Sequence, residues 1–399
     1  MARFSYVGIT TSGKQVKGEL QASNKNEVIS LLRKKKIRPI SVKTSSFSFE
    51  LPFLDSVKLQ DVSRFTRQFS AMTSAGLALV TCLDILGGQS DNKKLGASVK
   101  QVSSDIQGGS TLAEAMQKHP KIFNTLYVNM VAAGEASGSL DTVLSRLADY
   151  LEKSDALIRK IKGAMTYPVI VLCVAVAATI AMLTFVVPTF AQMFTESGGS
   201  LPLPTKIVMD ISNFLQKFGP LMLLMAVGIA VAISYYYKTP DGKLRIDILK
   251  LKLPVFGDLE RKSAISRFSQ TLSTLLTSGV TILDALSITA KTAGNKVLEL
   301  GILRTLERIS GGQTIAEPLK ETGVFPPMVI HMIAVGEKTG DLAEMLKKIS
   351  EFYQEEVDAA IEALTSIIEP IMIIVMGIVI GGILIAMYLP MFDMIGTIK

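Results

Sequence analysis

The sequence is poor in the residues that usually carry catalysis and metal binding. Among its 399 residues there are only two histidines and two cysteines. No Glu-x-x-His pattern, no cysteine pair at metal-site or disulfide spacing and no Gly-x-Ser-x-Gly pattern surrounds them. Isolated residues of this kind are most often structural, so we expect His119, His331, Cys82 and Cys173 to be packing residues. The sequence therefore predicts no catalytic residue, no metal ligand and no cofactor site.

A phosphate-binding loop is also missing from the sequence. The segment Gly336-Glu337-Lys338-Thr339-Gly340 resembles one, but the spacing Gly-x-x-x-x-Gly-Lys-Ser/Thr occurs nowhere in the chain. Any work driven by nucleotide hydrolysis must therefore be supplied by a partner.

Three long stretches, 168–188, 220–237 and 370–390, lack Asp, Glu, Lys, Arg and His. At 1.5 Å per helical residue, each is long enough to cross a bilayer core of roughly 30 Å. The chain is therefore predicted to cross a membrane three times. A carrier that couples to protons or ions usually needs an ionisable group within the membrane, so a carrier or channel is only a distant alternative.

The cations of the chain are distributed unevenly around these stretches. Nearly all of the 42 Lys and Arg residues lie before residue 167 or between 238 and 369, whereas the first connection between stretches holds only Lys206 and Lys217. By the positive-inside rule, the N-terminus lies in the cytoplasm and the C-terminus outside it. This bias accounts for the net charge of +7, and no basic motif interleaved with aromatic residues favours nucleic-acid binding.

The chain contains an internal repeat. Shifting the first copy by about two hundred positions superposes Pro168 on Pro370 and Pro188 on Pro390. The alignment is carried by segments 65–83 with 268–286, 109–114 with 312–317, 130–140 with 332–342, and 168–190 with 370–392. A single one-residue gap over such a length indicates a true duplication, in which each hydrophobic stretch ends one unit.

The sequence predicts a mainly α polytopic membrane protein with a small N-terminal α+β module. Helical spacing between recurring Gly, Pro and cap residues predicts two cytoplasmic bundles of about six helices each. The predicted parts are the module 1–43, a linker 44–57, the first bundle 58–166, a transmembrane helix 167–190, an extracytoplasmic loop 191–218, a transmembrane helix 219–237, the second bundle 238–366, a transmembrane helix 367–392 and an extracytoplasmic tail 393–399.

Residues that recur in both copies are the candidate functional positions. The segment Gly-Glu-x-x-Gly-x-Leu could bind a ligand through its acid, but an architectural role is favoured. In that role the first glycine allows close helix approach, the second ends the helix, and the acid caps or pairs locally. The positions are Gly76 and Gly279 in the Ser/Thr-x-Gly turns, and Gly134, Glu135, Gly138, Gly336, Glu337 and Gly340 in the duplicated segment.

Each bundle is predicted to run without interruption into its membrane span. No stop signal separates the last bundle helix from Pro168 in the first copy, or from Pro370 in the second. Inside the spans, Gly377 and Gly381 form a small-xxx-small pair, and Ala175 and Thr179 occupy the matching positions. Such pairs predict close helix packing, within the chain, between copies or with another protein.

The N-terminal module carries a basic run at the end of its predicted helix. It consists of Arg33, Lys34, Lys35, Lys36 and Arg38. Cations at this position offset the helix dipole. The alternative is contact with anionic lipid or with an acidic partner surface.

Taken together, these features resemble the type II secretion F-protein family, the polytopic platform proteins of type IV pilus and type II secretion machines. The resemblance covers essentially the whole chain, and the N-terminal module and the Met-Tyr-Leu-Pro ending favour the pilus branch. Its motifs, besides those above, are Gly13-Lys14, Leu31-Leu32-Arg33, Leu201-Pro202-Leu203-Pro204-Thr205, Leu253-Pro254-Val255-Phe256-Gly257 and Ala386-Met387-Tyr388-Leu389-Pro390-Met391-Phe392. Lys35-Lys36 departs from the glycine that the family commonly has there.

The resemblance implies a non-enzymatic platform in the bacterial inner membrane. It further implies a dimer or higher oligomer, cytoplasmic hexameric assembly and retraction ATPases as partners, and pilin subunits passed into or out of the fibre. Inner-membrane alignment proteins of the same machine are further implied partners. A platform protein of a type II secretion system is the close alternative.

Overall fold

In the computed structural model, the chain divides into two compact units, residues 1–56 and 57–399, each described here by itself. The structure describes residues 2–10, 15–22, 25–34, 37–44, 56–196 and 202–397.

The first unit contains a three-stranded antiparallel sheet in the order β2-β1-β3. Its elements are β1 (Ala2–Thr10), β2 (Gln15–Ala22), α1 (Lys25–Lys34) and β3 (Ile37–Thr44). Val28 and Leu32 of α1 are buried. Pro39 lies inside β3 opposite Gly8, where the register shifts. A proline is tolerated there because an irregular ladder does not need its missing N–H.

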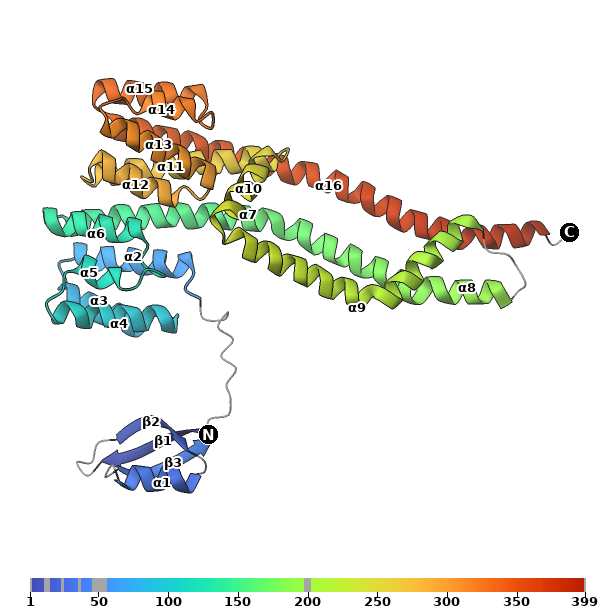
Figure 1. The fold of residues 1–399 in the computed structure, drawn as a ribbon, viewed down its shortest axis with the longest axis horizontal. Coiled ribbons are helices and arrows are strands. Elements are labelled where there is room, and N and C mark those ends of the chain that lie inside the picture. Colours follow the sequence, from blue (N-terminus) through green and yellow to red (C-terminus); the bar gives the residue numbers. More distant parts are fainter. Residues whose placement is uncertain are drawn as a thin grey trace. The chain divides into compact units, whose positions relative to one another are not determined.

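The first bundle of the second unit contains six helices, the number predicted (Figure 1). Asn92, Thr111 and Asn124 cap helix N-termini by accepting backbone N–H groups. Phe69 and Leu144 are fully buried in its apolar core. The helices are α2 (Leu59–Ser74), α3 (Leu79–Gln89), α4 (Lys93–Gln107), α5 (Leu112–Gln117), α6 (Thr125–Ser137) and α7 (Leu140–Ala181).

The second bundle repeats this plan and adds one helix before it. Asn295 and Thr281 again cap helix N-termini. The added helix is α10 (Pro240–Lys252), and the six repeated helices are α11 (Phe256–Thr277), α12 (Ile282–Thr292), α13 (Lys296–Ser310), α14 (Ala316–Glu321), α15 (Pro327–Thr339) and α16 (Leu342–Thr397). Buried Asp247 holds α10 in place: it accepts the backbone N–H of Lys296 at 2.9 Å and the Tyr237 hydroxyl at 3.1 Å.

The predicted continuity of bundle and span is confirmed. Pro168 lies inside α7, and α16 runs through Pro370 without a break. Three helical segments in the described chain are long and apolar enough to cross a membrane: Leu140–Met193, Leu203–Tyr237 and Leu342–Leu389. The first of them continues from α7 through η1 (Met182–Val186), a π-helical turn, into α8 (Val187–Glu196).

Most of the connection predicted at 191–218 is helical in the structure. α8 reaches Glu196, and α9 (Leu203–Tyr237) begins before the stretch that was expected to cross the membrane. Pro204 lies in the first turn of α9, where its missing N–H has no cost. Val208, Met209 and Leu215 of this added segment pack on a cluster formed by η1, α8 and α16 residues. Apolar contacts therefore extend the helix.

The two bundles stack on each other through different faces. The α6 and α7 side of the first bundle contacts the α11 and α12 side of the second (Figure 1). α7 and α16 then approach each other side by side: Leu157 shares an apolar cluster with Val357, and Leu183 shares one with Ile383. Both helices thus leave their bundles in the same direction.

Candidate functional site

The duplicated Gly-Glu-x-x-Gly-x-Leu segment closes each bundle. The carboxylate of Glu135 accepts the backbone N–H groups of Leu112 and Ala113 at 2.7 and 2.9 Å. These are the first residues of α5, whose N–H groups have no partner within their own helix. Glu337 repeats the arrangement, accepting Ile315 and Ala316 at 2.5 and 3.0 Å. The acid thus caps a helix more than twenty residues earlier in the chain, and its carboxylate is engaged within the fold.

The glycines of the same segment fit the architectural interpretation. Gly138 and Gly340 end α6 and α15 with φ values of +68° and +77°, a backbone region that glycine enters at no steric cost. A Cβ on Gly134 would lie 3.1 Å from Val143 Cβ. A Cβ on Gly336 would lie 2.9 Å from Leu342 Cα. Gly134 and Gly336 therefore allow α6 and α15 to pack closely on the helices that follow them.

The Ser/Thr-x-Gly turns and the basic run have simpler surroundings. Gly76 and Gly279 adopt φ values of +79° and +83° after α2 and α11, and a Cβ on either would meet no atom within 4 Å. These turns therefore require glycine because of its backbone angle.

The basic run lies at the end of the N-terminal helix. Arg33 and Lys34 end α1, and Arg38 is exposed. Lys35 and Lys36 lie outside the described residues.

The small residues of the spans do not form one packed site within the chain. Ala175 is buried and Thr179 half-buried. A Cβ on Gly377 or Gly381, in contrast, would meet no atom within 4 Å. The described chain therefore provides no close neighbour for this glycine pair, and a neighbour from another chain remains a proposal.

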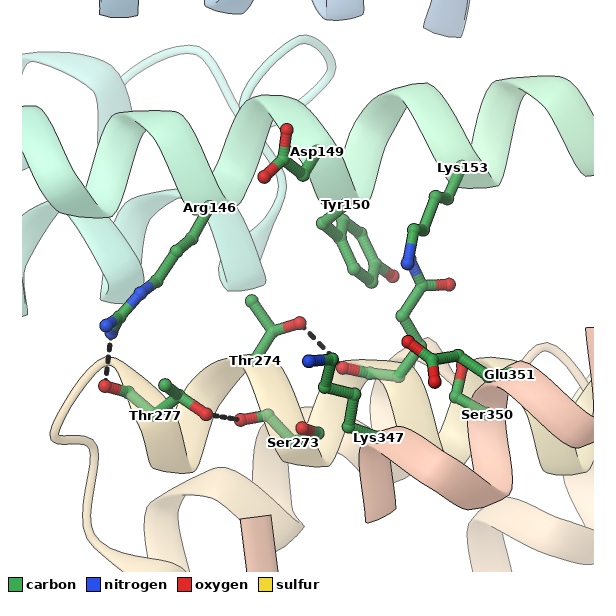
Figure 2. A pocket seen from close by; sticks show the side chains of 11 residues that line it. Arg146, Asp149, Tyr150, Lys153, Ser273, Thr274, Thr277, Lys347, Ser350 and Glu351 are labelled. Carbon is green, nitrogen blue, oxygen red and sulfur yellow. Dashed lines mark hydrogen bonds between the residues drawn. The ribbon is translucent and has the colours of Figure 1, made fainter. Parts of the chain in front are cut away.

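A cavity of about 270 Å³, lined mainly by polar and charged residues, lies where the two bundles meet. Figure 2 shows the side chains that line it. Side chains of α7 point into it from one side, and side chains of α11 and α16 from the other. The Tyr150 hydroxyl lies 3.2 Å from the Thr271 hydroxyl oxygen, and the Arg146 guanidinium donates to the carbonyl of Thr277. The sequence did not single out these residues, because their position on an inter-bundle face follows only from the way the copies stack. The cavity makes this part of the contact polar and incompletely filled.

Closer to the membrane the contact between the halves becomes apolar and ionic. Leu157, Leu259 and Val357 form a cluster against which Ile161 and Ile368 pack. The Lys160 ammonium lies 2.5 Å from the Asp358 carboxylate, although both groups are too exposed for the pair to contribute much stability. The two long helices are therefore held together just before they enter their spans.

Polar residues of α9 bind the backbone of the neighbouring spans. Ser212 donates to the carbonyl of Leu183, and Gln216 donates to the carbonyl of Thr184 at 3.2 Å. Both carbonyls lie in the π-helical turn η1, where the regular helical ladder is interrupted. Thr205 donates to the carbonyl of Ala386 at 2.5 Å. The sequence signal was present, since these polar residues lie in the amphipathic part of α9, but their partners could not be read from it.

The arrangement offers scaffold contacts. In the described part of the chain, no group of three or more His, Cys, Asp and Glu residues could hold a metal ion. Burial raises the pKa of the Cys82 thiol above its usual value, so this thiol is a poor nucleophile. The Arg67 guanidinium, which donates to Glu152 at 2.7 Å, lowers the pKa of that carboxyl while tying α2 to α7.

Comparison with known proteins gives a consistent result over the whole chain. The model of the type II secretion system protein F matches residues 65–188 and again 268–390, and the model of its N-terminal domain matches residues 1–43. The type IV pilus assembly protein PilC of Myxococcus xanthus is 43% identical over 100% of this chain and 96% of its own length. The protein of the same name from Thermus thermophilus is 43% identical over 100% of both chains. The type II secretion system protein F of Pseudomonas aeruginosa is 32% identical over 99% of both.

Proposed function

This chain belongs to the type II secretion system protein F family, and we propose that it is the inner-membrane platform protein of a type IV pilus machine. In this role it couples cytoplasmic assembly and retraction ATPases to the insertion and removal of pilin subunits at the base of the fibre. The observation that carries the proposal is the continuity of α7 and α16, each of which belongs both to a bundle and to a span.

A long unbroken helix is suited to transmitting force. The 42 residues of α7 extend over about 60 Å at 1.5 Å per residue. A push or rotation applied to a bundle therefore reaches the membrane through a rigid element. The cluster around Leu157 and Val357 holds the two helices together before the membrane, so that their spans move as a pair.

The polar contact between the bundles supports a moving platform. A cavity of about 270 Å³ and a few hydrogen bonds hold less tightly than a filled apolar core. Small rearrangements around this cavity therefore cost less than elsewhere in the apolar core, which is continuous between the two bundles. The ATP-driven step belongs to the partner, and the platform itself hydrolyses nothing.

The pilus machine is favoured over the secretion machine by similarity. Two relatives that bear the pilus assembly name are each 43% identical to this chain, whereas a relative that bears the type II secretion name is 32% identical. We therefore place pilin in contact with the spans, with Gly377 and Gly381 as a packing surface for helices of other chains. Pilus ATPases and inner-membrane alignment proteins are the other proposed partners.

The topology follows from the charge distribution. We propose that the N-terminus and both bundles lie in the cytoplasm and that the C-terminus lies outside it. Arg33 to Arg38 then lie on the cytoplasmic side, where they meet either anionic lipid or an acidic partner. Glu135, Glu337 and the glycines of their segments act as structural positions that keep each bundle closed.

Deletion of the gene in its own host tests this proposal. We expect surface pili to be lost while pilin remains in the membrane and export of folded proteins continues. Expression of the chain from a plasmid restores pili. Loss of protein export with intact pili would instead assign the chain to a secretion machine, and ATP hydrolysis by the purified chain would contradict a passive platform.

A further inference from the structure

Each bundle has two faces that correspond to the two sides of the contact between the bundles, and within the chain only one face of each bundle takes part in that contact. Within the chain, the α6 and α7 face of the first bundle packs on the α11 and α12 face of the second. The repeat gives each bundle both faces. The second bundle therefore presents an α15 and α16 face, and the first bundle an α2 and α3 face, that correspond to the two halves of this contact. Because the two faces of this contact are different, the same contact can form again between one chain and a second copy of the chain.

The α15 and α16 face is open where its counterpart is covered. From α6 onward, residues of the second copy lie 202 positions after those of the first, as Met332 lies after Met130. Tyr150, which lines the cavity between the bundles, and Ala133 of α6 are half-buried, whereas their counterparts Phe352 and Val335 are 42% and 50% exposed. Two large apolar side chains thus face solvent on this side of the second bundle.

The α2 and α3 face shows the complementary asymmetry. Here the offset is 203 positions, as between Phe65 and Phe268. Ile288 and Thr271 of the second bundle are 5% and 1% exposed, and their counterparts Ile85 and Gln68 are both exposed, Ile85 by 39%. The first bundle therefore lacks the neighbour that buries these positions in the second.

Charges on the two open faces complement each other. Lys153 and Gln270 line the cavity between the bundles, and their counterparts on the open faces are Glu355 and Arg67. Glu355 thus has the opposite charge to Lys153, and Arg67 is a cation in place of Gln270. Arg67 also donates to Glu152 and Asp149 within its own chain. Arg146, which contacts the end of α11, has a cation as its counterpart: Lys348, which is exposed on α16. The end of α2 corresponds to the end of α11.

We propose that a second copy of this chain docks its α15 and α16 face on the α2 and α3 face of the first. The docking repeats between chains the contact that each chain makes within itself. Phe352 then covers Gln68, and Glu355 pairs with Arg67. Because α7 and α16 leave their bundles in the same direction, added copies remain side by side in one membrane and form a ring or a row.

Cross-linking between two differently tagged copies of the chain tests this interface. One tagged chain carries Phe352→Cys and a differently tagged chain carries Gln68→Cys, both with Cys82 and Cys173 replaced by alanine. The two are co-expressed in membranes and treated with a short bis-maleimide. We expect a product that contains both tags. In the matched control, Ala97→Cys on the exposed side of α4 replaces Gln68→Cys, and at least tenfold less product is expected.

A charge exchange gives an independent measurement. Glu355→Arg on one chain is expected to lower the yield of the Phe352–Gln68 cross-link severalfold, and Arg67→Glu on the other chain to restore it. A product from Phe352→Cys chains alone would indicate a two-fold interface and overturn the proposal. So would the absence of any product, in which case the α2 and α3 face is covered in another way. The dimer or higher oligomer that the family resemblance implies gains a defined surface here. The cross-link is measured without pili, so its failure would leave the proposed pilus function unaffected.

Discussion

The carboxylate of Glu135 accepts the backbone N–H of Leu112 at 2.7 Å, which joins the end of α6 to the start of α5. Glu337 and Ile315 repeat this relationship in the second bundle. A half-buried cap of this kind satisfies N–H groups that no other part of the helix can serve. The same device thus closes both bundles.

Removal of either carboxylate is expected to destabilise its bundle. Glu135→Ala and Glu337→Ala each leave two N–H groups without their acceptor, at a cost of about 1–3 kcal/mol. Thermal unfolding of the full chain in detergent measures the loss. Glu307→Ala, at an exposed position of α13, is the control and should stay within about 0.5 kcal/mol of the parent. Equal effects at all three positions would contradict the capping role.

Glycine-to-alanine substitutions should have opposite effects at two kinds of position. Gly134→Ala and Gly336→Ala place a Cβ 3.1 Å from Val143 Cβ and 2.9 Å from Leu342 Cα, respectively, and should destabilise by about 1–3 kcal/mol. Gly163→Ala in α7, with no atom within 4 Å, should stabilise by roughly 0.5–1 kcal/mol because alanine favours the helix. Chemical denaturation separates the two signs. If Gly134→Ala or Gly336→Ala stabilised the protein, the neighbouring helices would have enough space for a Cβ and the close-packing role would be contradicted.

Flexible insertions should uncouple the bundles from the spans. A short Gly-Ser segment placed before Tyr167 and before Glu369 interrupts α7 and α16 where each approaches the membrane. We expect surface pili to disappear while the amount of protein in the membrane is unchanged. The same segment inserted between Gly311 and Gly312, in an exposed turn, should leave piliation intact. Normal piliation with the insertions before Tyr167 and Glu369 would contradict a rigid connection between bundle and span.

The contribution of Arg67 should depend on pH. Arg67 lowers the pKa of Glu152, so their pairing stabilises the fold above the ordinary pKa of a glutamate and is lost as pH falls through the lowered value. Both side chains are partly exposed, which limits the effect of Arg67→Ala at pH 7 to about 1 kcal/mol. Thermal unfolding at pH 7 and in mild acid should show the difference between parent and variant shrinking. A difference that is constant with pH would mean that Arg67 acts through packing alone.

The duplication made much of the fold predictable. Helical spacing, turn glycines and the alignment of Pro168 with Pro370 predicted paired six-helix bundles continuous with their spans. The contacts between the two bundles were not predictable. Tyr150 and Phe352 occupy the same position of the repeat, and yet Tyr150 is half-buried and Phe352 is exposed. The place of Pro39 within a strand depended on an irregular register, which residue type alone does not reveal.

The candidate site was predicted unevenly. The glycines of the duplicated segment could be assigned to turns and close packing because only glycine suits both. That Glu135 caps α5 could not be assigned, since the two helices come together only through tertiary folding. Likewise, Ser212 and Gln216 are visible as polar residues in α9, but the carbonyls that they serve are created by a local change in the helix of another span.

The π-helical turn at Met182–Val186 means that duplicated sequence does not produce duplicated surfaces in the bilayer. One additional residue in a helical turn rotates everything beyond it by about 100°. Phe190 therefore lies at another angle around its helix than Phe392, which follows an α-helix without such a turn. The two spans thus present different surfaces to any helix that lies beside them in the bilayer.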